Sequence, residues 1–248
     1  MILLAETRAG LSLMSRQFSY CKELENMITS RSTVGRTGKV FPLLEALSTV
    51  NNLKDLRALM LQEKPYSTIE TGLGPGGSVL MFAASHRDLG HEPTRQHVAI
   101  DPYQTSIWDN SGRLVLEKAK LEAYVEVREQ DSFVALPKLL SEGRRFDIAY
   151  IDGSHQFENV FIDFFYIQEM LNVGGLIVFD DSTYPQVRKV LNFIEANYNF
   201  AYQRLSMASF RRNKLRYVIA ERIHKTQMTV FRKLKAERRH WLTPLKNF

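Results

Sequence analysis

Four side chains able to bind a metal or move a proton stand directly after two short apolar runs. Asp152 and His155 follow the run IAYI, and Asp180 and Asp181 follow the run LIVF. Runs of about four to eight apolar and β-branched residues that end in polar ones are typical of buried strands in a parallel sheet. Ligands bind outside the carboxyl ends of such strands. The sequence therefore predicts that these four residues share one chemically active rim.

The three carboxylates of this rim predict a metal site. Carboxylates at adjacent strand ends repel one another unless a cation or proton lies among them, and Mg²⁺ prefers a few hard oxygen ligands with room for water. We expect Asp152, Asp180 and Asp181 to hold the ion. His155, with an ordinary pKa of about 6.5, is then the expected general base for a substrate hydroxyl. The structural alternatives are that His155 binds a loop backbone and that one acid of the 180–181 pair caps the next helix.

Further strand and helix signals precede and follow the rim residues along the sequence. Residues 67–70, 97–101 and 125–129 read as strands with helices between them, and Phe157 to Leu171 is long enough for a crossover helix. Phe200 to Ser206 and Leu215 to Ile223 follow with no helix between them and should pair as an antiparallel hairpin. The pattern predicts an α/β fold, with a doubly wound seven-stranded sheet and an antiparallel C-terminal hairpin.

Two flanking segments complete the expected organisation. Residues 1–64 should form N-terminal helices: one from about Gly10 to Ile28, and a pair over Phe41 to Leu61 that turns at Asn51-Asn52. Between them, Ser30 to Lys39 is a candidate lid, in which Arg36 and Thr37 are the candidates for substrate contact. Residues 65–223 form the expected core. Residues 224–248 form an expected basic helical extension.

Composition indicates an ordinary globular protein. The 248 residues are 44% hydrophobic and 24% charged, which suits one large α/β domain. No apolar run approaches the roughly 20 residues that span a bilayer, and the start MILLAETRAG is not typical of a signal peptide. The single cysteine, Cys21, excludes an internal disulfide and fits a reducing compartment. We expect a soluble, cytoplasmic protein.

Positive charge is concentrated near the C-terminus. The formal net charge is +6, yet the residues from 204 onward contain thirteen Lys and Arg and only two acids, Glu221 and Glu237. A basic end can bind nucleic acid or an anionic surface. It can also be a solvated helix face or a subunit contact, which we favour, with a homo-oligomer (a dimer) as the expected assembly.

A glycine loop, IETGLGPGGS, lies at the first strand-to-helix turn. Glycines let the backbone turn tightly and let a ligand approach closely. Gly72, Gly74 and Gly77 fit the dinucleotide pattern G-x-G-x-x-G, whereas Gly72, Gly74 and Gly76 fit G-x-G-x-G. The glycine spacing alone does not choose between the two kinds of ligand.

Acids around this loop make the pattern more specific. Glu70 precedes the first glycine by two residues, Asp101 ends the second strand, and Asp131 with Ser132 follows the third. Together with FDIAYIDGSH and GGLIVFDD, this combination resembles the class I S-adenosylmethionine-dependent methyltransferases, with their Rossmann-like sheet, from about Ser67 to Ile223. The resemblance implies three groups of cofactor-binding residues: Glu70, Gly72, Gly74 and Gly76 for the methionine part, Asp101 for the ribose, and Asp131 with Ser132 for the adenine. Pro75 inside the loop departs from the usual pattern.

The acidic rim is similar to that of the metal-dependent, catechol-type O-methyltransferases. Those enzymes carry an Asp after the fourth strand, an Asp-Asn or Asp-Asp pair after the fifth, and a base three residues past the first Asp; here the places are filled by Asp152, Asp180, Asp181 and His155. The usual base is a lysine, so histidine is a substitution in role. IDGSH with FDD also resembles a bacterial subfamily in which metal use varies. The resemblance implies O-methylation of a small-molecule hydroxyl (a sugar, phenol or diol) assisted by Mg²⁺.

Three other functions compete with this interpretation. An NAD(P)-linked oxidoreductase fits the glycines but leaves IDGSH and FDD unexplained. An RNA-directed methyltransferase would use the basic C-terminal segment, although the aromatic proline motif of base N-methyltransferases is absent and DGSH stands in its place. A non-catalytic binding module is disfavoured by the intact glycines and acids.

Overall fold

The computed structural model describes residues 16–43, 48–210, 213–222 and 225–248. Its centre is a seven-stranded sheet in the order β5-β4-β3-β6-β7-β9-β8. The first five of these strands are mutually parallel, and β9 runs antiparallel to both of its neighbours. The strand bounds are Thr68–Thr71 (β3), His97–Ile100 (β4), Val125–Arg128 (β5), Phe146–Ile151 (β6), Leu171–Phe179 (β7), Tyr202–Leu205 (β8) and Thr229–Lys233 (β9). The predicted doubly wound α/β fold is confirmed.

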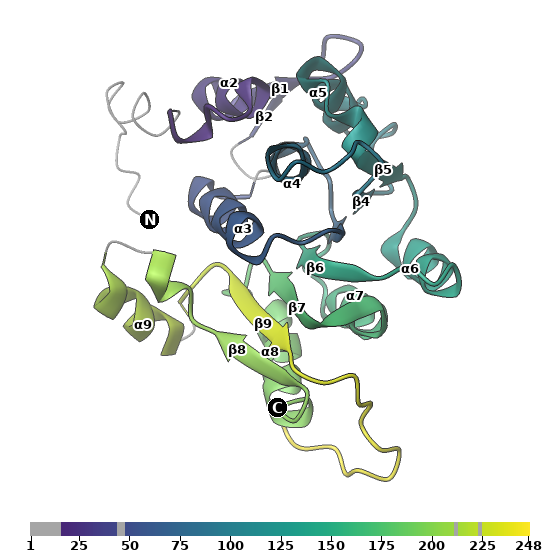
Figure 1. Cartoon of the computed structure of the whole chain (residues 1–248), viewed down its shortest axis with the longest axis vertical. Helices are drawn as coiled ribbons and strands as arrows, with labels where there is room; N and C mark the ends of the chain where they lie inside the picture. The colour runs from purple at the N-terminus through teal and green to yellow at the C-terminus, as the bar shows by residue number, and fades with distance from the viewer. Residues whose placement is uncertain (1–15, 44–47, 211–212, 223–224) are drawn as a thin grey trace.

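Helices cover both faces of this sheet (Figure 1). One apolar cluster joins the sheet to helices 2 to 5, and a second joins the opposite face to helices 6 to 8. Neighbouring residues of a strand serve opposite faces: Val230 belongs to the first cluster and Phe231 to the second. The helices are Lys22–Ser30 (α2), Val50–Glu63 (α3), Gly77–Asp88 (α4), Ser111–Ala119 (α5), Ser132–Ser141 (α6), Phe157–Met170 (α7), Pro185–Asn197 (α8) and Lys214–Arg222 (α9), with short 3₁₀ turns at Arg16–Phe18, Glu122–Tyr124 and Met207–Phe210. Among the described residues, no helix has the length and apolarity needed to cross a membrane.

The N-terminal part differs from the predicted helices. Of the expected helix over Gly10 to Ile28, residues before 16 lie outside the described ranges, and α2 begins only at Lys22. The expected helix pair over Phe41 to Leu61 is wrong: Val40–Pro42 is strand β2, paired with β1 (Ser32–Val34), and a single helix α3 follows. The predicted turn at Asn51-Asn52 is the first turn of α3, because the side chain of Thr49 accepts a hydrogen bond from the Asn52 backbone N–H and caps the helix.

The C-terminal part requires a second correction. Leu215 to Ile223 was predicted as a strand, but Lys214–Arg222 is helix α9, and the side-chain oxygen of Asn213 accepts a hydrogen bond from the Arg216 backbone N–H at its start. The partner of β8 is instead β9, which lies inside the segment predicted as a basic helical extension. That extension contains no helix in its described residues, and its first part belongs to the core sheet.

Candidate functional site

A pocket of about 1000 Å³ opens at the carboxyl ends of the parallel strands. The glycine loop after β3 forms one part of its wall, and the acidic residues after β6 and β7 form another. Of the residues predicted as functional, it is lined by Gly72, Gly74, Asp101, Asp131, Ser132, Asp152, His155, Asp180 and Asp181. The sheet therefore brings the two predicted groups of side chains into one cavity, as the shared strand ends imply.

The glycine loop is held closed by Asp101. Gly72 has a φ of +92° and its N–H donates to the Ile100 carbonyl at 2.8 Å, which ties the loop to β4. One carboxylate oxygen of Asp101 accepts from the Gly74 N–H at 2.6 Å, and the other accepts from the Tyr103 N–H at 2.7 Å. Asp101 thus fixes the loop's backbone while lining the pocket beside it.

We predict that Gly72→Ala destabilises the fold and the pocket together. A Cβ at Gly72 would lie 2.2 Å from the backbone oxygen of Asp152, and the positive φ adds strain for any other residue. The matched control is Gly90→Ala, at φ +78° with no atom within 4 Å, which isolates the backbone strain. Thermal unfolding should show a loss of roughly 1 kcal/mol for Gly90→Ala and clearly more for Gly72→Ala. Equal losses would contradict the predicted clash.

Two residues of the predicted cofactor set do not line the pocket. Glu70 is fully buried in β3, and its carboxylate lies 3.3 Å from Nε2 of the buried His97. Gly76 precedes α4, where a Cβ would lie 2.6 Å from the side chain of Val115, so its small size serves packing against α5. Both residues belong to the glycine-loop segment but lie outside the pocket lining.

A buried acid that the sequence reasoning missed also lines the pocket. Asp163, on α7, is 2% exposed, lines the cavity, and its Oδ1 has no hydrogen-bond partner. Burial raises the pKa of Asp163 to about 6, against the lowering influence of the Ser132 and Thr71 hydroxyls. The sequence signal was a lone acid within the apolar stretch NVFIDFFYI, since a buried carboxyl needs a partner or a function.

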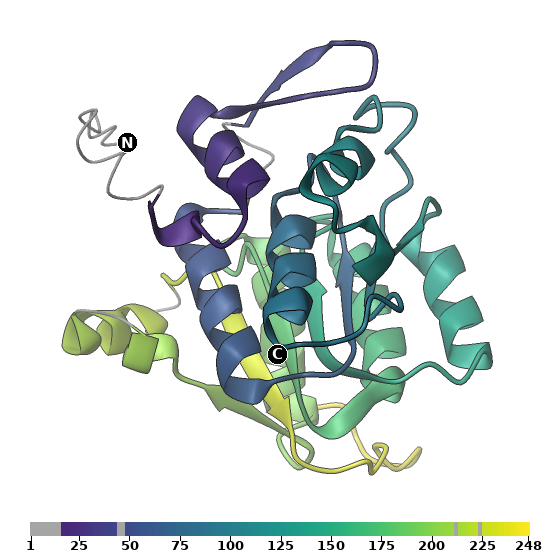
Figure 2. The same ribbon diagram turned by 45° about the horizontal axis from the view of Figure 1, so that its top comes forward.

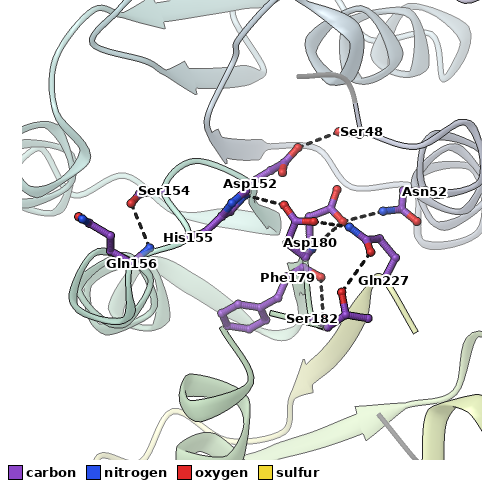
Figure 3. Close-up of polar contacts among 12 residues, drawn as sticks. Ser48, Asn52, Asp152, Ser154, His155, Gln156, Phe179, Asp180, Ser182 and Gln227 are labelled. Atoms are coloured by element: carbon purple, nitrogen blue, oxygen red, sulfur yellow. Dashed lines mark hydrogen bonds and ion pairs between the residues drawn. The ribbon is translucent and has the colours of Figure 1, made fainter. Parts of the chain in front are cut away.

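Two side chains donate hydrogen bonds to Asp180 of the acidic rim, and Figure 3 shows one of them, Asn52 of α3. The Asn52 side chain donates to one of its oxygens at 2.6 Å, and the Tyr150 hydroxyl donates to the other. Ser48 links the same network to Asp152, whose Oδ2 accepts from the Ser48 hydroxyl at 2.7 Å. The first turn of α3 and the residue before its cap therefore position the acids, which sequence reasoning did not anticipate.

His155 and Asp181 form the exposed side of the rim. His155 Nε2 lies 2.5 Å from Asp181 Oδ2, and the Gln227 amide donates to the other oxygen of Asp181. The ring of Tyr184 stacks on the imidazole with centroids 4.9 Å apart, which fixes the plane of the ring. A histidine held in this way, and still 47% exposed, can reach a group bound in the pocket.

The electrostatics of the rim follow from its crowding. Burial, and then the charge of Asp180, raise the pKa of Asp152 well above its usual range. Burial likewise raises the pKa of Asp180. The hydrogen bond from His155 to Asp181 raises the pKa of the imidazole. Each pKa is raised, as expected where several carboxylates lie close together: neighbouring negative charges disfavour ionised carboxylates and favour a protonated imidazole.

Three residues of the rim could together hold a divalent cation, and this group differs by one residue from the predicted set. Within the described residues, Asp152, His155 and Asp181 each offer a ligand atom, and these atoms lie within 4.8 Å of one another. Asp180 is not in this group, because its oxygens are directed to Asn52 and Tyr150. Two carboxylates suit Mg²⁺ or Mn²⁺, whereas an imidazole as third ligand would favour a softer metal.

The candidate lid does not reach the pocket. Arg36 and Thr37 lie at the turn between β1 and β2, where the Thr37 hydroxyl donates to Asp109 at 2.7 Å and Arg36 pairs with Glu117. Neither residue lines the cavity in this structure. The contacts to Asp109 instead fix the hairpin against the loop before α5.

Comparisons with known proteins agree with this architecture. Residues 69–182 match a methyltransferase domain family. The chain is 28% identical over 123 residues to a caffeoyl-CoA O-methyltransferase of Stellaria longipes, covering 48% of this chain and 47% of that protein, about half of its length. Two solved O-methyltransferases are 16% identical: TomG from Streptomyces achromogenes, in complex with SAM (TM-score 0.59, 94% of this chain and 93% of that one), and one from Bacillus cereus, in complex with SAH (TM-score 0.57, 94% of each). At such identities the structural likeness establishes the fold.

Proposed function

We propose that the chain is a class I methyltransferase that transfers a methyl group from S-adenosylmethionine to a hydroxyl oxygen of a small molecule, which the family match over residues 69–182 and the likeness of its fold to O-methyltransferases support. One observation carries the proposal: the glycine loop with Asp101 and the acidic rim with His155 open on the same cavity. About 1000 Å³ is the upper end of ordinary ligand pockets, which leaves room for an acceptor beside the cofactor.

The loop side suits the cofactor. The backbone of Gly72 and Gly74 permits close approach, and Asp131 and Ser132, which line the same cavity, are the proposed residues for the adenine. Asp101 accepts from two backbone N–H groups and, at 3.2 Å, from the Gln104 side chain, and a carboxylate has about four acceptor positions, so one position remains for a ribose hydroxyl. S-adenosylmethionine, when bound, supplies an electrophilic methyl group on its sulfonium.

The acidic side suits the acceptor. In the proposed reaction, the acceptor oxygen forms a bond to the methyl carbon as the carbon–sulfur bond breaks in line with it, and His155 takes the hydroxyl proton. Tyr184 and Asp181 keep the imidazole oriented for that transfer. A divalent ion held by Asp152 and Asp181 would lower the pKa of the bound hydroxyl. The remaining contribution of the protein is alignment of the two reacting groups.

The RNA-directed alternative has less support at the pocket. Lysine and arginine supply most of the affinity for a phosphate backbone, and an RNA substrate would bring phosphates close to the reacting centre. Among the described residues that line the cavity there is neither. The acidic rim would repel a phosphate backbone, so we favour a small neutral or cationic acceptor.

Calorimetry with S-adenosylhomocysteine tests the cofactor assignment. We expect a micromolar Kd, about −8 kcal/mol. Asp101→Ala should weaken binding by about 10- to 100-fold, since a hydrogen bond to a charged group contributes roughly 1.5–3 kcal/mol. The matched control is Asp147→Ala: Asp147 also accepts from two backbone N–H groups, those of Tyr66 and Ser67, but lies at the opposite end of the sheet. Absent binding, or equal affinity in Asp101→Ala, would contradict the assignment.

A further inference from the structure

The segment after β9 forms a projecting loop, which we call the C-terminal loop (residues 234–248). β9 is antiparallel to β7, with Thr229 opposite Phe179 and Arg232 opposite Leu176, so the chain leaves the sheet at the end away from the pocket. Figures 1 and 2 show this loop in yellow, extending from the edge of the body below β8 and β9. A partner bound to it would leave the mouth of the pocket open.

Both ends of the C-terminal loop are anchored. At its start, the Leu234 N–H donates to the Ala201 carbonyl at 2.7 Å. At its far end, the backbone of Lys246 exchanges two hydrogen bonds with the Asn197 side chain, at 2.9 and 3.1 Å. The ring of Phe248 packs edge-on against Phe193 with centroids 5.1 Å apart. The loop therefore has a defined place on the surface.

Between these anchors, apolar side chains point into solvent. Thr243 N–H donates to the His240 carbonyl at 2.9 Å, which closes a turn with Trp241 and Leu242 at its centre. Trp241 is 85% exposed, Leu242 64% and Leu245 58%. Central turn positions usually carry Gly, Pro, Asn, Asp or Ser, so a Trp-Leu tip is unusual. Isolated exposed apolar residues are common, but three within five positions indicate a contact surface.

Basic residues precede and follow this tip in the sequence. The C-terminal loop contains Lys235, Arg238, Arg239 and Lys246 against one acid, Glu237. The Arg239 guanidinium donates to the Thr243 carbonyl at 2.6 Å, which places positive charge against the turn itself. Arg238 pairs with Glu169 of α7, which ties the loop to the body. The apolar tip is thus flanked by cations.

We propose that the C-terminal loop docks on an anionic lipid surface. Tryptophan is favoured at the boundary between lipid headgroups and acyl chains, and leucines beside it gain from burial in hydrocarbon. Lysine and arginine near the surface are attracted by anionic headgroups. The combination of an apolar turn tip and flanking cations on a fixed loop matches both parts of such a surface.

Two other occupants fit less well. RNA would pair with the cations and stack on Trp241, but leucines gain little from nucleotides. A second copy of the chain in a two-fold contact would bring the same basic residues to face each other. Neither occupant uses both the leucines and the cations.

Vesicle sedimentation tests the proposal with the full chain. Vesicles of phosphatidylcholine and phosphatidylserine, about 2:1, should bind the protein, and vesicles of phosphatidylcholine alone should not. Combined Trp241→Ser, Leu242→Ser and Leu245→Ser should abolish binding. Lys235→Gln with Lys246→Gln should weaken it about tenfold or more. Matched controls that should bind like the wild type are Leu215→Ser, which removes another exposed leucine, and Lys118→Gln with Lys138→Gln, which removes two exposed charges elsewhere.

A fluorescence measurement locates the contact. In a Trp108→Phe chain, Trp241 is the sole tryptophan, and its emission should shift to the blue with anionic vesicles. Thermal unfolding of each variant checks that the fold is kept. Absent vesicle binding, or binding that survives the triple serine change, would overturn the proposal. It would also be overturned if the protein bound a single-stranded RNA oligonucleotide but not vesicles, or if the triple change only converted a dimer to a monomer.

Discussion

Replacing His155 with alanine is expected to slow methyl transfer by about 10²- to 10⁴-fold, the range for loss of a general base. Affinity for S-adenosylhomocysteine should stay the same, because the loop and Asp101 form a separate part of the pocket wall. The imidazole is oriented by Asp181 at 2.5 Å and by the ring of Tyr184, so its loss removes a positioned proton acceptor. The measurement is release of S-adenosylhomocysteine with an acceptor found among phenols, diols and sugars.

Further experiments distinguish the role of His155 as a general base from the contribution of a bound metal ion. His240→Ala removes an exposed histidine in the C-terminal loop and should leave the rate unchanged. If an ion assists, a chelator should abolish turnover and Mg²⁺ or Mn²⁺ should restore it, and calorimetry should show Mn²⁺ binding that Asp181→Asn weakens. Full activity in chelator would reject the ion and keep His155 as the base. A wild-type rate in His155→Ala would reject His155.

The core of the fold and the pocket's location were predictable because they depend on short-range patterns. Apolar runs that stop on acid mark parallel strands, and the carboxyl ends of such strands meet at one edge. Asp152, Asp180 and Asp181 therefore lie at one rim, as expected. Their individual partners were not predictable, since Ser48, just before α3, and Asn52, in its first turn, lie 104 and 128 residues away in the sequence from the acids that they contact.

The C-terminal error has a physical cause. In residues 215–223, β-branched and aromatic residues suggested a strand, but α9 has no buried residue, and the cap at Asn213 was the stronger signal. β9 was not recognised within the basic stretch because four of its five residues are buried. A strand buried on both faces lacks the alternation of apolar and polar residues that marks a strand with one exposed face. The buried Lys233 is accommodated because its ammonium donates to the Gln168 and Leu171 carbonyls, at 2.6 and 2.8 Å.

Changing Asp163 to asparagine is expected to stabilise the protein without cofactor and to weaken cofactor binding. Burial raises the pKa of Asp163 to about 6, above the ordinary value near 3.8. A raised pKa means that the folded state holds more protons than the unfolded one between these values, so this group's contribution to stability falls as pH rises from about 4 to about 6. Above pH 6 the burial of its charge costs about 3 kcal/mol at most.

Asp163→Asn removes that cost, so thermal unfolding at pH 7 should shift upward by about 5–10 °C, and the gain should shrink toward pH 4. Asp88→Asn, at a partly exposed acid paired with Arg57, should show no gain.

Because Oδ1 of Asp163 has no partner and the residue lines the pocket, we expect a donor group of the cofactor to supply that partner. Calorimetry with S-adenosylhomocysteine should then show affinity about 10- to 100-fold weaker in Asp163→Asn, since the lost bond is to a charged group. A gain in thermal stability with unchanged affinity for S-adenosylhomocysteine would mean that Asp163 does not contact the cofactor. No gain in thermal stability at pH 7 would mean that hydrogen bonds from the Ser132 and Thr71 hydroxyls already offset the cost of burying the carboxylate.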